Sequence, residues 1–253
     1  MRVALVAGGQ PRFTPDFVRV MHQLEGFDTA DLYIALWESD WARDDDTARA
    51  KIQSALLPNY QLAKVKILPQ PECPLPAGTP TLESPQPENV MWWYKRGYNQ
   101  SYSLALANDL IDQEYDLVIK IRLDGSLDRQ VDLSQINIGD DLIMSPNGEA
   151  GWPDFMMNEQ FVIGRQDRMK LYFDLGYKFS EYVPIADPNW YTNHHGSWRG
   201  EWLSGTYMKK NGINRIRGEF NHDINRYGRS RFTDKHYHHG IAPDPTEQRI
   251  IFK

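Results

Sequence analysis

The sequence YDLVIKIRLDGS, residues 115–126, decides the fold, because a short aliphatic run stands directly before two charged residues. Between Val118 and Leu123 the side chains are mainly aliphatic and β-branched, and Gly125 closes the run. Such a run predicts a strand that is buried on both faces of an α/β sheet. The carboxyl end of such a strand is the edge at which open α/β sheets bind ligands.

Arg122 and Asp124 follow this run with one residue between them. Side chains one pleat apart project to the same side of a strand, so we expect the two to lie together where the strand ends. A carboxylate there could hold a divalent metal that carries a diphosphate, while the guanidinium contacts the phosphates. The alternative is a surface ion pair that caps the strand, and the sequence leaves both open.

The composition indicates an ordinary globular protein. Of 253 residues, 41% are hydrophobic and 25% are charged, which suits one domain over residues 1–253. No apolar run approaches the roughly 20 residues that cross a bilayer, and the run at residues 3–7 is too short for a signal peptide. Cys73 is the only cysteine, which fits a reducing compartment. We therefore expect a cytoplasmic protein.

Charge is unevenly distributed along the chain. The net charge of −6 argues against a nucleic-acid partner. Residues 31–46 are acidic, whereas residues 209–235 are rich in Lys and Arg. The basic segment could bind a small anion, or it could be a solvated face.

The first part of the chain predicts a strand, a glycine turn and a helix. Residues 2–7 are an apolar strand, Gly8 and Gly9 provide a tight turn, and a helix is expected over residues 14–26. The sequence GGQPR is not the GxGxxG fingerprint, so a classical NAD site is not expected. Arg12 lies before the helix amino terminus, where a phosphate would be stabilised.

Strands and helices alternate in the rest of the chain, which predicts a mostly parallel sheet flanked by helices. The expected strands are residues 31–37, 62–68, 141–145, 160–163 and 213–217, and the expected helices are residues 44–57, 89–114, 166–175 and 200–211.

Three segments do not fit this alternation. Residues 68–88 hold seven prolines, so we expect a surface excursion over the sheet edge or a linker. Residues 177–199 are rich in aromatic side chains and are expected to shape a binding mouth. Residues 218–253 read as an irregular basic tail, whose His236, His238 and His239 resemble a group of metal ligands.

Polar side chains at the starts of several elements are further candidates for binding. On the helix at 89–114, Lys95, Arg96 and Gln100 could reach a ligand, whereas Trp92 and Trp93 are expected to pack in the core. Glu159 and Gln160 open an otherwise apolar element, either as solvent contacts or as groups held for a substrate hydroxyl. His194 and His195 could act as base or ligand, although a loop pair of histidines is more often a surface feature.

Five segments together resemble the nucleotide-sugar-dependent glycosyltransferases of the GT-A type. They are most similar to the WavE-like group, which is linked to lipopolysaccharide and polysaccharide synthesis, and to related viral or phage proteins. The segments are VALVAGGQPR (3–12), DLYIALW (31–37), YDLVIKIRLD (115–124), NEQFVIG (158–164) and EWLSGTYMKKNGI (201–213). They occur in the expected order and span most of the chain, although the group more often has Asp in place of Glu159.

The resemblance implies a GT-A-like, Rossmann-like fold and a donor site at the ends of the first and central strands. Gly8, Gly9 and Arg12 would lie against the nucleotide and its diphosphate. Arg122 and Asp124 would occupy the place of the metal-binding acidic motif, with Asp124 as the ligand of Mn²⁺ or Mg²⁺. Because Arg122 replaces the first carboxylate, arginine side chains could neutralise the diphosphate instead.

The same resemblance places the acceptor chemistry at two glutamates. Glu159 and Glu201 are the candidate catalytic bases, because a hydroxyl nucleophile must lose a proton. The remaining candidate donor-binding residues are Lys95 and Gln160. As an alternative role, Glu201 could be no more than a first-turn acid that stabilises its helix.

The expected function is therefore transfer of a sugar from a nucleotide sugar to a hydroxyl of a glycan or lipid-linked glycan, in the cytoplasm, at a membrane surface or in a host cell. Because the first carboxylate is replaced, a catalytically silent carbohydrate-binding or virion-associated protein is the alternative. A nucleotidyltransferase is a third possibility, since it would share the strand-end aspartate and Arg12.

Overall fold

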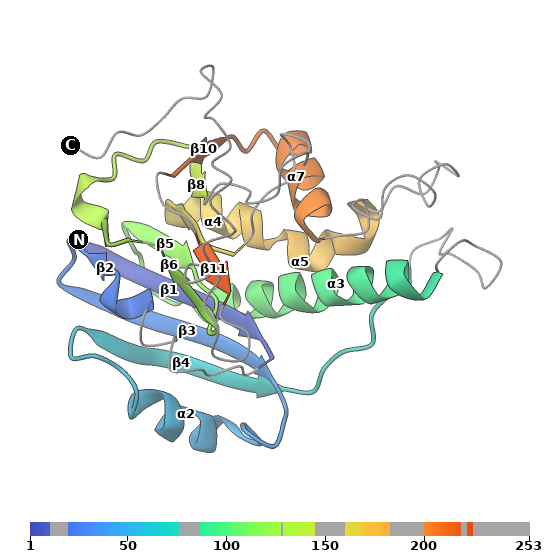
Figure 1. Ribbon diagram of the computed structural model, residues 1–253, viewed down its shortest axis with the longest axis horizontal. Coiled ribbons are helices and arrows are strands. Elements are labelled where there is room, and N and C mark those ends of the chain that lie inside the picture. Colours follow the sequence, from blue (N-terminus) through green and yellow to red (C-terminus); the bar gives the residue numbers. More distant parts are fainter. Residues whose placement is uncertain are drawn as a thin grey trace, which may run out of the picture.

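The fold is a seven-stranded sheet with helices packed against it (Figure 1). The structure is a computed structural model that describes residues 1–10, 20–75, 87–127, 129–144, 160–182, 200–218 and 222–224. The sheet order is β10-β8-β9-β5-β1-β3-β4. Its strands are β1 (Arg2–Gly9), β3 (Thr29–Trp37), β4 (Tyr60–Leu68), β5 (Leu117–Lys120), β8 (Leu142–Met144), β9 (Val162–Gly164) and β10 (Arg215–Arg217).

The helices and the two small ribbons complete the described part. The helices are α2 (Asp45–Gln53), α3 (Pro87–Asp109), α4 (Gln166–Phe173), α5 (Leu175–Lys178) and α7 (Gly200–Lys210), with short 3-10 helices η1 (Leu133–Gln135) and η2 (Phe179–Tyr182). Two further strand pairs lie outside the main sheet: β2 (Leu24–Glu25) with β7 (Val131–Asp132), and β6 (Gly125–Leu127) with β11 (His222–Ile224).

The sheet is mostly parallel, as the alternation of elements predicts. Strands β5, β1, β3 and β4 are parallel to one another, and β10 is parallel to β8. Within the main sheet β9 runs against both of its neighbours, β5 and β8. The carboxyl ends of β1, β3, β5 and β8 therefore meet at one edge, where β9 begins.

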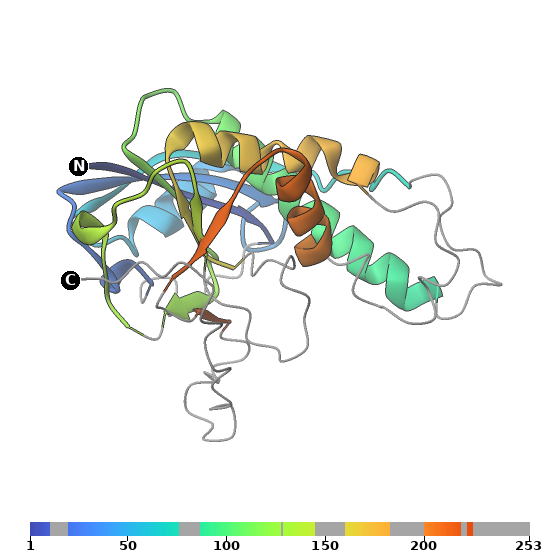
Figure 2. The same cartoon turned by 90° about the horizontal axis from the view of Figure 1, so that it is seen from above.

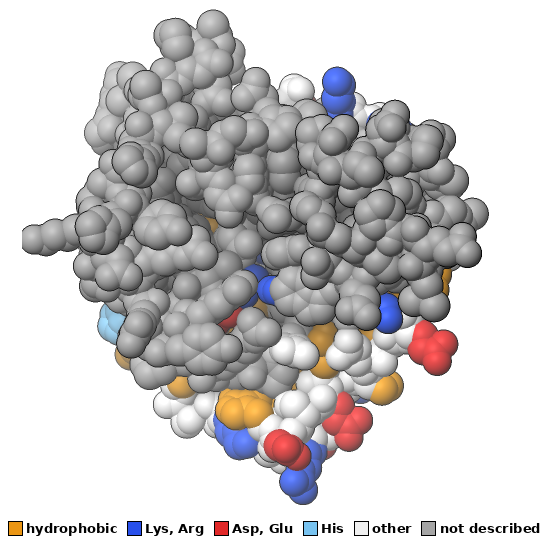
Figure 3. Space-filling view, turned by 45° about the vertical axis from the view of Figure 1, so that its right-hand side comes forward, with side chains coloured by type: hydrophobic (Ala, Val, Ile, Leu, Met, Phe, Trp, Pro, Cys, Tyr) orange, Lys and Arg blue, Asp and Glu red, His pale blue; other side chains and the backbone are white. Residues whose placement is uncertain are grey.

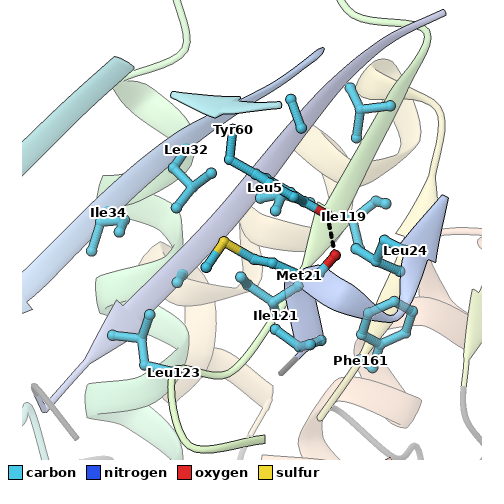
Figure 4. Close-up of a cluster of buried hydrophobic side chains, with 14 of the residues drawn as sticks. Leu5, Met21, Leu24, Leu32, Ile34, Tyr60, Ile119, Ile121, Leu123 and Phe161 are labelled. Atoms are coloured by element: carbon cyan, nitrogen blue, oxygen red, sulfur yellow. Dashed lines mark hydrogen bonds between the residues drawn. The ribbon is translucent and has the colours of Figure 1, made fainter. Parts of the chain in front are cut away.

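One face of the sheet packs on a core of aliphatic side chains (Figure 4). Leu5, Leu32 and Ile119 project from neighbouring strands toward residues 20–24, which cross this face. The hydroxyl of Tyr60 donates a hydrogen bond of 2.6 Å to the carbonyl of Met21. This bond satisfies a buried phenol inside an otherwise apolar cluster.

The opposite face is covered by α3, α4, α5 and α7. Figure 2 shows α4 and α5 on one side of the sheet and the β6–β11 ribbon on the other. Helix α3 lies along β1 and β3, and its amino-terminal half extends past their carboxyl ends (Figure 1). This placement brings the first half of α3 beside the edge at which the parallel strands end.

The amino ends of the strands carry a buried polar cluster. Asp31 is 6% exposed, and its carboxylate accepts hydrogen bonds from Tyr115 and Gln61. The hydroxyls of Tyr33 and Tyr115 lie 2.7 Å apart. Burial, together with the bond to Asp31, raises the pKa of Tyr115. The cluster stabilises the edge of the sheet that lies opposite the predicted ligand-binding edge.

The expected strands and helices are present, with several corrections at their ends. The first strand runs through Gly9 because Gly8 and Gly9 still pair with β3, so the expected turn at these glycines is wrong. Leu24 lies in β2 and not on a helix, since Val131 next to it in β7 supplies a strand partner. The predicted helix start at Thr14 and Pro15 lies outside the described residues.

Two helix ends also differ from the expectation. Helix α3 ends at Asp109 and not at residue 114. Gly176, expected to stop its helix, lies inside α5, and a Cβ there would overlap the backbone of Ser101 in α3. Gly176 therefore allows two helices to pack closely. Among the described residues, no helix is both long and apolar enough to span a bilayer.

Candidate functional site

A cavity of about 270 Å³ lies at the carboxyl ends of β1, β3 and β5, beside the amino-terminal half of α3. Its wall includes Gly8 and Gly9 from β1, Trp37 from β3 and Arg96 from α3. Figure 3 views the molecule with this edge of the sheet brought forward, and basic and acidic side chains meet near the middle of the face. The cavity is where the sequence places the ligand-binding edge.

The end of β1 forms one wall of the cavity through its two glycines. A Cβ on Gly8 would lie 2.7 Å from Ser103 Oγ and 2.8 Å from the Ser103 carbonyl carbon, so only glycine lets α3 approach β1 this closely. Gly9 has a φ of 108°, a backbone conformation that residues other than glycine rarely adopt. The backbone of β1 therefore reaches the cavity without side chains, which lets a ligand approach it directly.

The segment after β5 forms the cavity floor. The amide of Ile121 still donates to the carbonyl of Val6, but the chain then turns, because the amide of Gly125 donates to the carbonyl of Arg122 at 3.3 Å. A turn therefore brings Arg122 and Asp124 together. The prediction that they lie one pleat apart on an extended strand is wrong. Both residues line the cavity.

Arg122 and Asp124 form a bidentate ion pair inside this turn. Arg122 Nε donates to Asp124 Oδ1 and Arg122 Nη2 donates to Asp124 Oδ2, each at 2.8 Å. Their side chains are only 15% and 5% exposed, so the pair is not the surface cap that the sequence allowed as an alternative. Parallel bonds of this kind fix both side chains.

Lys120, the last residue of β5, contributes a buried ammonium group to the same cavity. The residue is 1% exposed, and its Nζ donates to the hydroxyl of Tyr172 at 3.2 Å. In the sheet Lys120 pairs with Val6, two residues before Gly8. The register thus sets a lysine beside the glycine end of β1.

Helix α3 presents one polar face to the cavity. Arg96, Asn99 and Gln100 line it, at the three- and four-residue spacing that puts side chains on one side of a helix. Asn99 Oδ1 is buried and accepts no hydrogen bond from the described part of the chain. A buried acceptor without a partner favours a ligand that donates a hydrogen bond at this point.

The charges around the cavity favour an anion. Among the described lining residues, the cationic side chains are Arg96, Lys120 and Arg122, and the single anionic one is Asp124. Protein atoms surround much of the cavity, so water screens these charges less than it would on an open surface. The cations therefore attract an anion more strongly. The site is therefore suited to a phosphate or diphosphate group.

The described residues do not fit the divalent metal that the family resemblance implies. Mn²⁺ and Mg²⁺ are held by several oxygen ligands, of which carboxylates are the usual protein donors. Asp124 is the one carboxylate among the described lining residues, and both its oxygens accept from Arg122. Within the described ranges no group of three His, Cys, Asp or Glu side chains could hold a metal. Asp128 and the histidines at 236, 238 and 239 lie outside those ranges.

Other predicted site residues lie elsewhere or outside the described ranges. Lys95 is exposed and is not part of the cavity wall. Burial raises the pKa of the Cys73 thiol to about 11, and the charge of Lys95 opposes this rise. Gln160 is half-buried just before β9, at the same sheet edge but outside the wall.

The two candidate bases remain predictions. Glu159 lies outside the described residues, as do Arg12, His194 and His195. Glu201 is the second residue of α7, and its side chain is outside the described part. Of the predicted residues, the cavity thus brings together Gly8, Gly9, Arg96, Gln100, Arg122 and Asp124.

The sequence prediction missed Lys120 and Asn99. Lys120 interrupts an aliphatic run that was expected to be buried on both faces, and lysine is almost never fully buried unless its charge is used. A lysine inside a run predicted to be buried was therefore a sign in the sequence that its charge binds a partner or ligand. No such sign in the sequence pointed to Asn99, because its position in the cavity depends on how α3 crosses β1.

Comparison with other proteins adds no identification. The chain matches no protein-family model, and no curated protein matches it. The resemblance to GT-A glycosyltransferases therefore stays a prediction from the spaced sequence motifs. The structure itself is an α/β fold with a mostly parallel seven-stranded sheet flanked by helices, compatible with a Rossmann-like fold.

Proposed function

We propose that this protein is a nucleotide-sugar-dependent glycosyltransferase with a GT-A-like fold, and that its donor binds in the cavity at the ends of β1 and β5. The observation that carries the proposal is the pair of cations, Lys120 and Arg96, in the cavity wall beside the glycine end of β1. A UDP-, GDP- or dTDP-sugar brings two phosphates to its site, and their charge must be neutralised as the bond between sugar and phosphate breaks.

The shape of the cavity supports this assignment. Its volume of about 270 Å³ is near the lower limit of small-molecule sites, so it accommodates the diphosphate with part of the donor. Trp37 supplies an aromatic wall, and it is fixed by stacking on Tyr102 with ring centroids 6.3 Å apart. A flat apolar surface beside cations suits a base or a sugar ring next to its phosphates.

The acceptor in this proposal is a hydroxyl of a glycan or a lipid-linked glycan. In the sequence Glu159 comes three residues before β9, and Glu201 is the second residue of α7. Either carboxylate would take the hydroxyl proton as the acceptor oxygen attacks the anomeric carbon. The two glutamates are alternatives for one role.

The proposal is tested by donor binding followed by turnover. UDP-, GDP-, CMP- and dTDP-sugars are each added to the protein, and the melting temperature and the release of free nucleotide are measured. We expect one nucleotide class to raise the melting temperature, because a ligand that binds only the folded state stabilises it. The same class should be hydrolysed slowly to free nucleotide. Absence of both effects with every donor would refute the proposal.

A catalytically silent protein on the same fold is the second candidate, and one specific observation favours it. Arg122 replaces a carboxylate of the family motif, and its ion pair with Asp124 occupies both oxygens of the remaining acid. A silent carbohydrate-binding or virion-associated protein would retain the cavity without turnover. Stabilisation by a donor or free sugar with no nucleotide release, with and without Mn²⁺, would favour this candidate.

A further inference from the structure

We propose that Lys120 and Arg96, and not a divalent metal, neutralise the diphosphate of the bound nucleotide. This inference rests on the proposed function and deepens it, because it assigns the charge partner of the leaving group. Lys120 and Arg96 come from two different elements, β5 and α3, and both line the same cavity.

The position of Lys120 supports its role. Lys120 lines the cavity and is 1% exposed as a residue, and its ammonium is oriented by the hydroxyl of Tyr172, which accepts from Nζ at 3.2 Å. The same ammonium lies 5.5 Å from the centre of the Tyr172 ring. A fixed, desolvated cation interacts with a phosphate more strongly than a mobile surface lysine does.

Arg96 provides the second cation from helix α3. It lies one helical turn before Asn99 and Gln100, so the three side chains form a polar strip along α3 that faces the cavity. A guanidinium offers several donors in one plane, which matches two oxygens of a phosphate. The buried Oδ1 of Asn99 would accept from a hydroxyl of the same ligand.

Arg122 and Asp124 act as positioning residues in this arrangement. Arg122 directs two of its nitrogens to Asp124, and the pair closes the turn over residues 122–125 at the cavity floor. The carboxylate that would bind a metal is thereby already neutralised by a cation. A second cation at Asp124 would have to compete with this bidentate pair, so the metal role expected from the family passes to Lys120 and Arg96.

The test measures nucleotide affinity with and without metal. UDP, GDP and dTDP are titrated into the full-length protein by isothermal calorimetry, in EDTA and again in Mn²⁺. The variants are Lys120→Met and Arg96→Met, with Lys170→Met as the matched control, because Lys170 is exposed on α4 and lies outside the cavity wall. Circular dichroism and melting curves establish that each variant is folded.

The expected result is equal affinity of one nucleotide in EDTA and in Mn²⁺. Each cavity variant should lose about tenfold or more in affinity, since a hydrogen bond to a charged group is removed, whereas Lys170→Met should bind like the parent. If Lys120→Met does not fold, the affinity of Arg96→Met alone tests the inference. Arg96 is only partly buried on α3, so this variant is expected to fold.

Two other results would overturn the inference, and they differ in whether the proposed function is also overturned. Binding that requires Mn²⁺ and persists in both cavity variants would overturn the metal-free role of Lys120 and Arg96 but retain the proposed function. Absence of binding by UDP, GDP and dTDP in both conditions would overturn the proposed diphosphate-donor function as well.

Discussion

The guanidinium of Arg122 and the carboxylate of Asp124 form two parallel hydrogen bonds of 2.8 Å at the floor of the cavity. The two side chains are 15% and 5% exposed, so each would leave a mostly buried charge behind if the other were removed. This relationship gives the pair a role in stability that is separate from any role in ligand binding.

Removal of either partner should therefore destabilise the protein. Arg122→Met and Asp124→Leu should each lower the free energy of unfolding by about 3 kcal/mol, because a mostly buried charge loses its bidentate partner. Urea denaturation measures the change. The double variant should lose less than the sum of the single losses, as residues in contact do not act independently. Strictly additive losses would contradict the pairing.

The packing of Gly8 against Ser103 gives a second prediction. Gly8→Ala should lower the free energy of unfolding by about 1–3 kcal/mol, because the added methyl group overlaps the backbone of α3. Ser103→Ala should not rescue it, since the carbonyl carbon of Ser103 would still lie 2.8 Å from the new Cβ.

Gly139 supplies the control for this substitution. A Cβ on Gly139 would meet nothing within 4 Å, so Gly139→Ala should change stability by less than about 0.5 kcal/mol. Equal effects of the two substitutions in urea denaturation would refute close packing at Gly8.

Arg96 and its neighbour Lys95 separate the structural assignment from the sequence prediction. The sequence names both residues as able to reach a ligand and chooses Lys95 as the donor-binding one, but Arg96 lines the cavity, whereas Lys95 is exposed and outside its wall. Arg96→Met should therefore weaken nucleotide binding about tenfold or more, and Lys95→Met should weaken it less. Calorimetric titration with the nucleotide that stabilises the protein most provides the comparison, and the reverse order would favour the sequence prediction.

Helix α2 gives a prediction on pH. The backbone amide of Thr47 and then its hydroxyl donate to Asp44, and these bonds lower the pKa of that carboxyl. A pKa that is lower in the folded state adds stability above the unfolded value of about 3.9 and loses it as the pH falls through the folded value.

Asp44→Ala should accordingly lower the melting temperature at neutral pH, and the deficit should shrink at acidic pH where the carboxyl is protonated in both states. Asp44→Asn is the matched variant, because an amide oxygen can cap the helix without titrating. Melting curves over a pH series check both variants. A deficit of Asp44→Ala that does not change with pH would contradict this origin.

The strands and helices with strong local patterns were predictable from the sequence. Residues 31–37 and 62–68 alternate or run apolar, and they form β3 and β4. Asp44 begins a helix with acids in its first turn, and α2 starts immediately after it. These features depend on neighbouring residues in the chain, so pattern and capping chemistry are sufficient.

Features that depend on distant partners were not predictable in the same way. Gly176 was expected to end a helix, but its place is set by the backbone of Ser101. Leu24 was expected on a helix, but Val131 next to it in β7 holds it in a strand. Both partners are far away in the sequence, and local pattern carries no information about them.

The candidate site likewise contains residues that local sequence patterns identify and residues that depend on distant partners. Arg122 and Asp124 were identifiable because they follow a buried run, although a turn and not a pleat brings them together. Arg96 was also named as able to reach a ligand, and it lines the cavity because α3 extends past the strand ends, whereas Lys120 was missed because it joins the site only through the pairing of β5 with β1. Their common wall depends on the order of the strands, which no single motif fixes.

The central claim is that the cavity between Gly9, Lys120 and Arg96 is the site of the donor diphosphate, and a crystal structure with a bound nucleotide tests it most directly. The protein would be crystallised with whichever of UDP, GDP or dTDP raises its melting temperature most. We expect the diphosphate to lie within hydrogen-bonding distance of Lys120 Nζ and the Arg96 guanidinium. A nucleotide bound elsewhere, or one whose phosphates point away from both cations, would contradict the account.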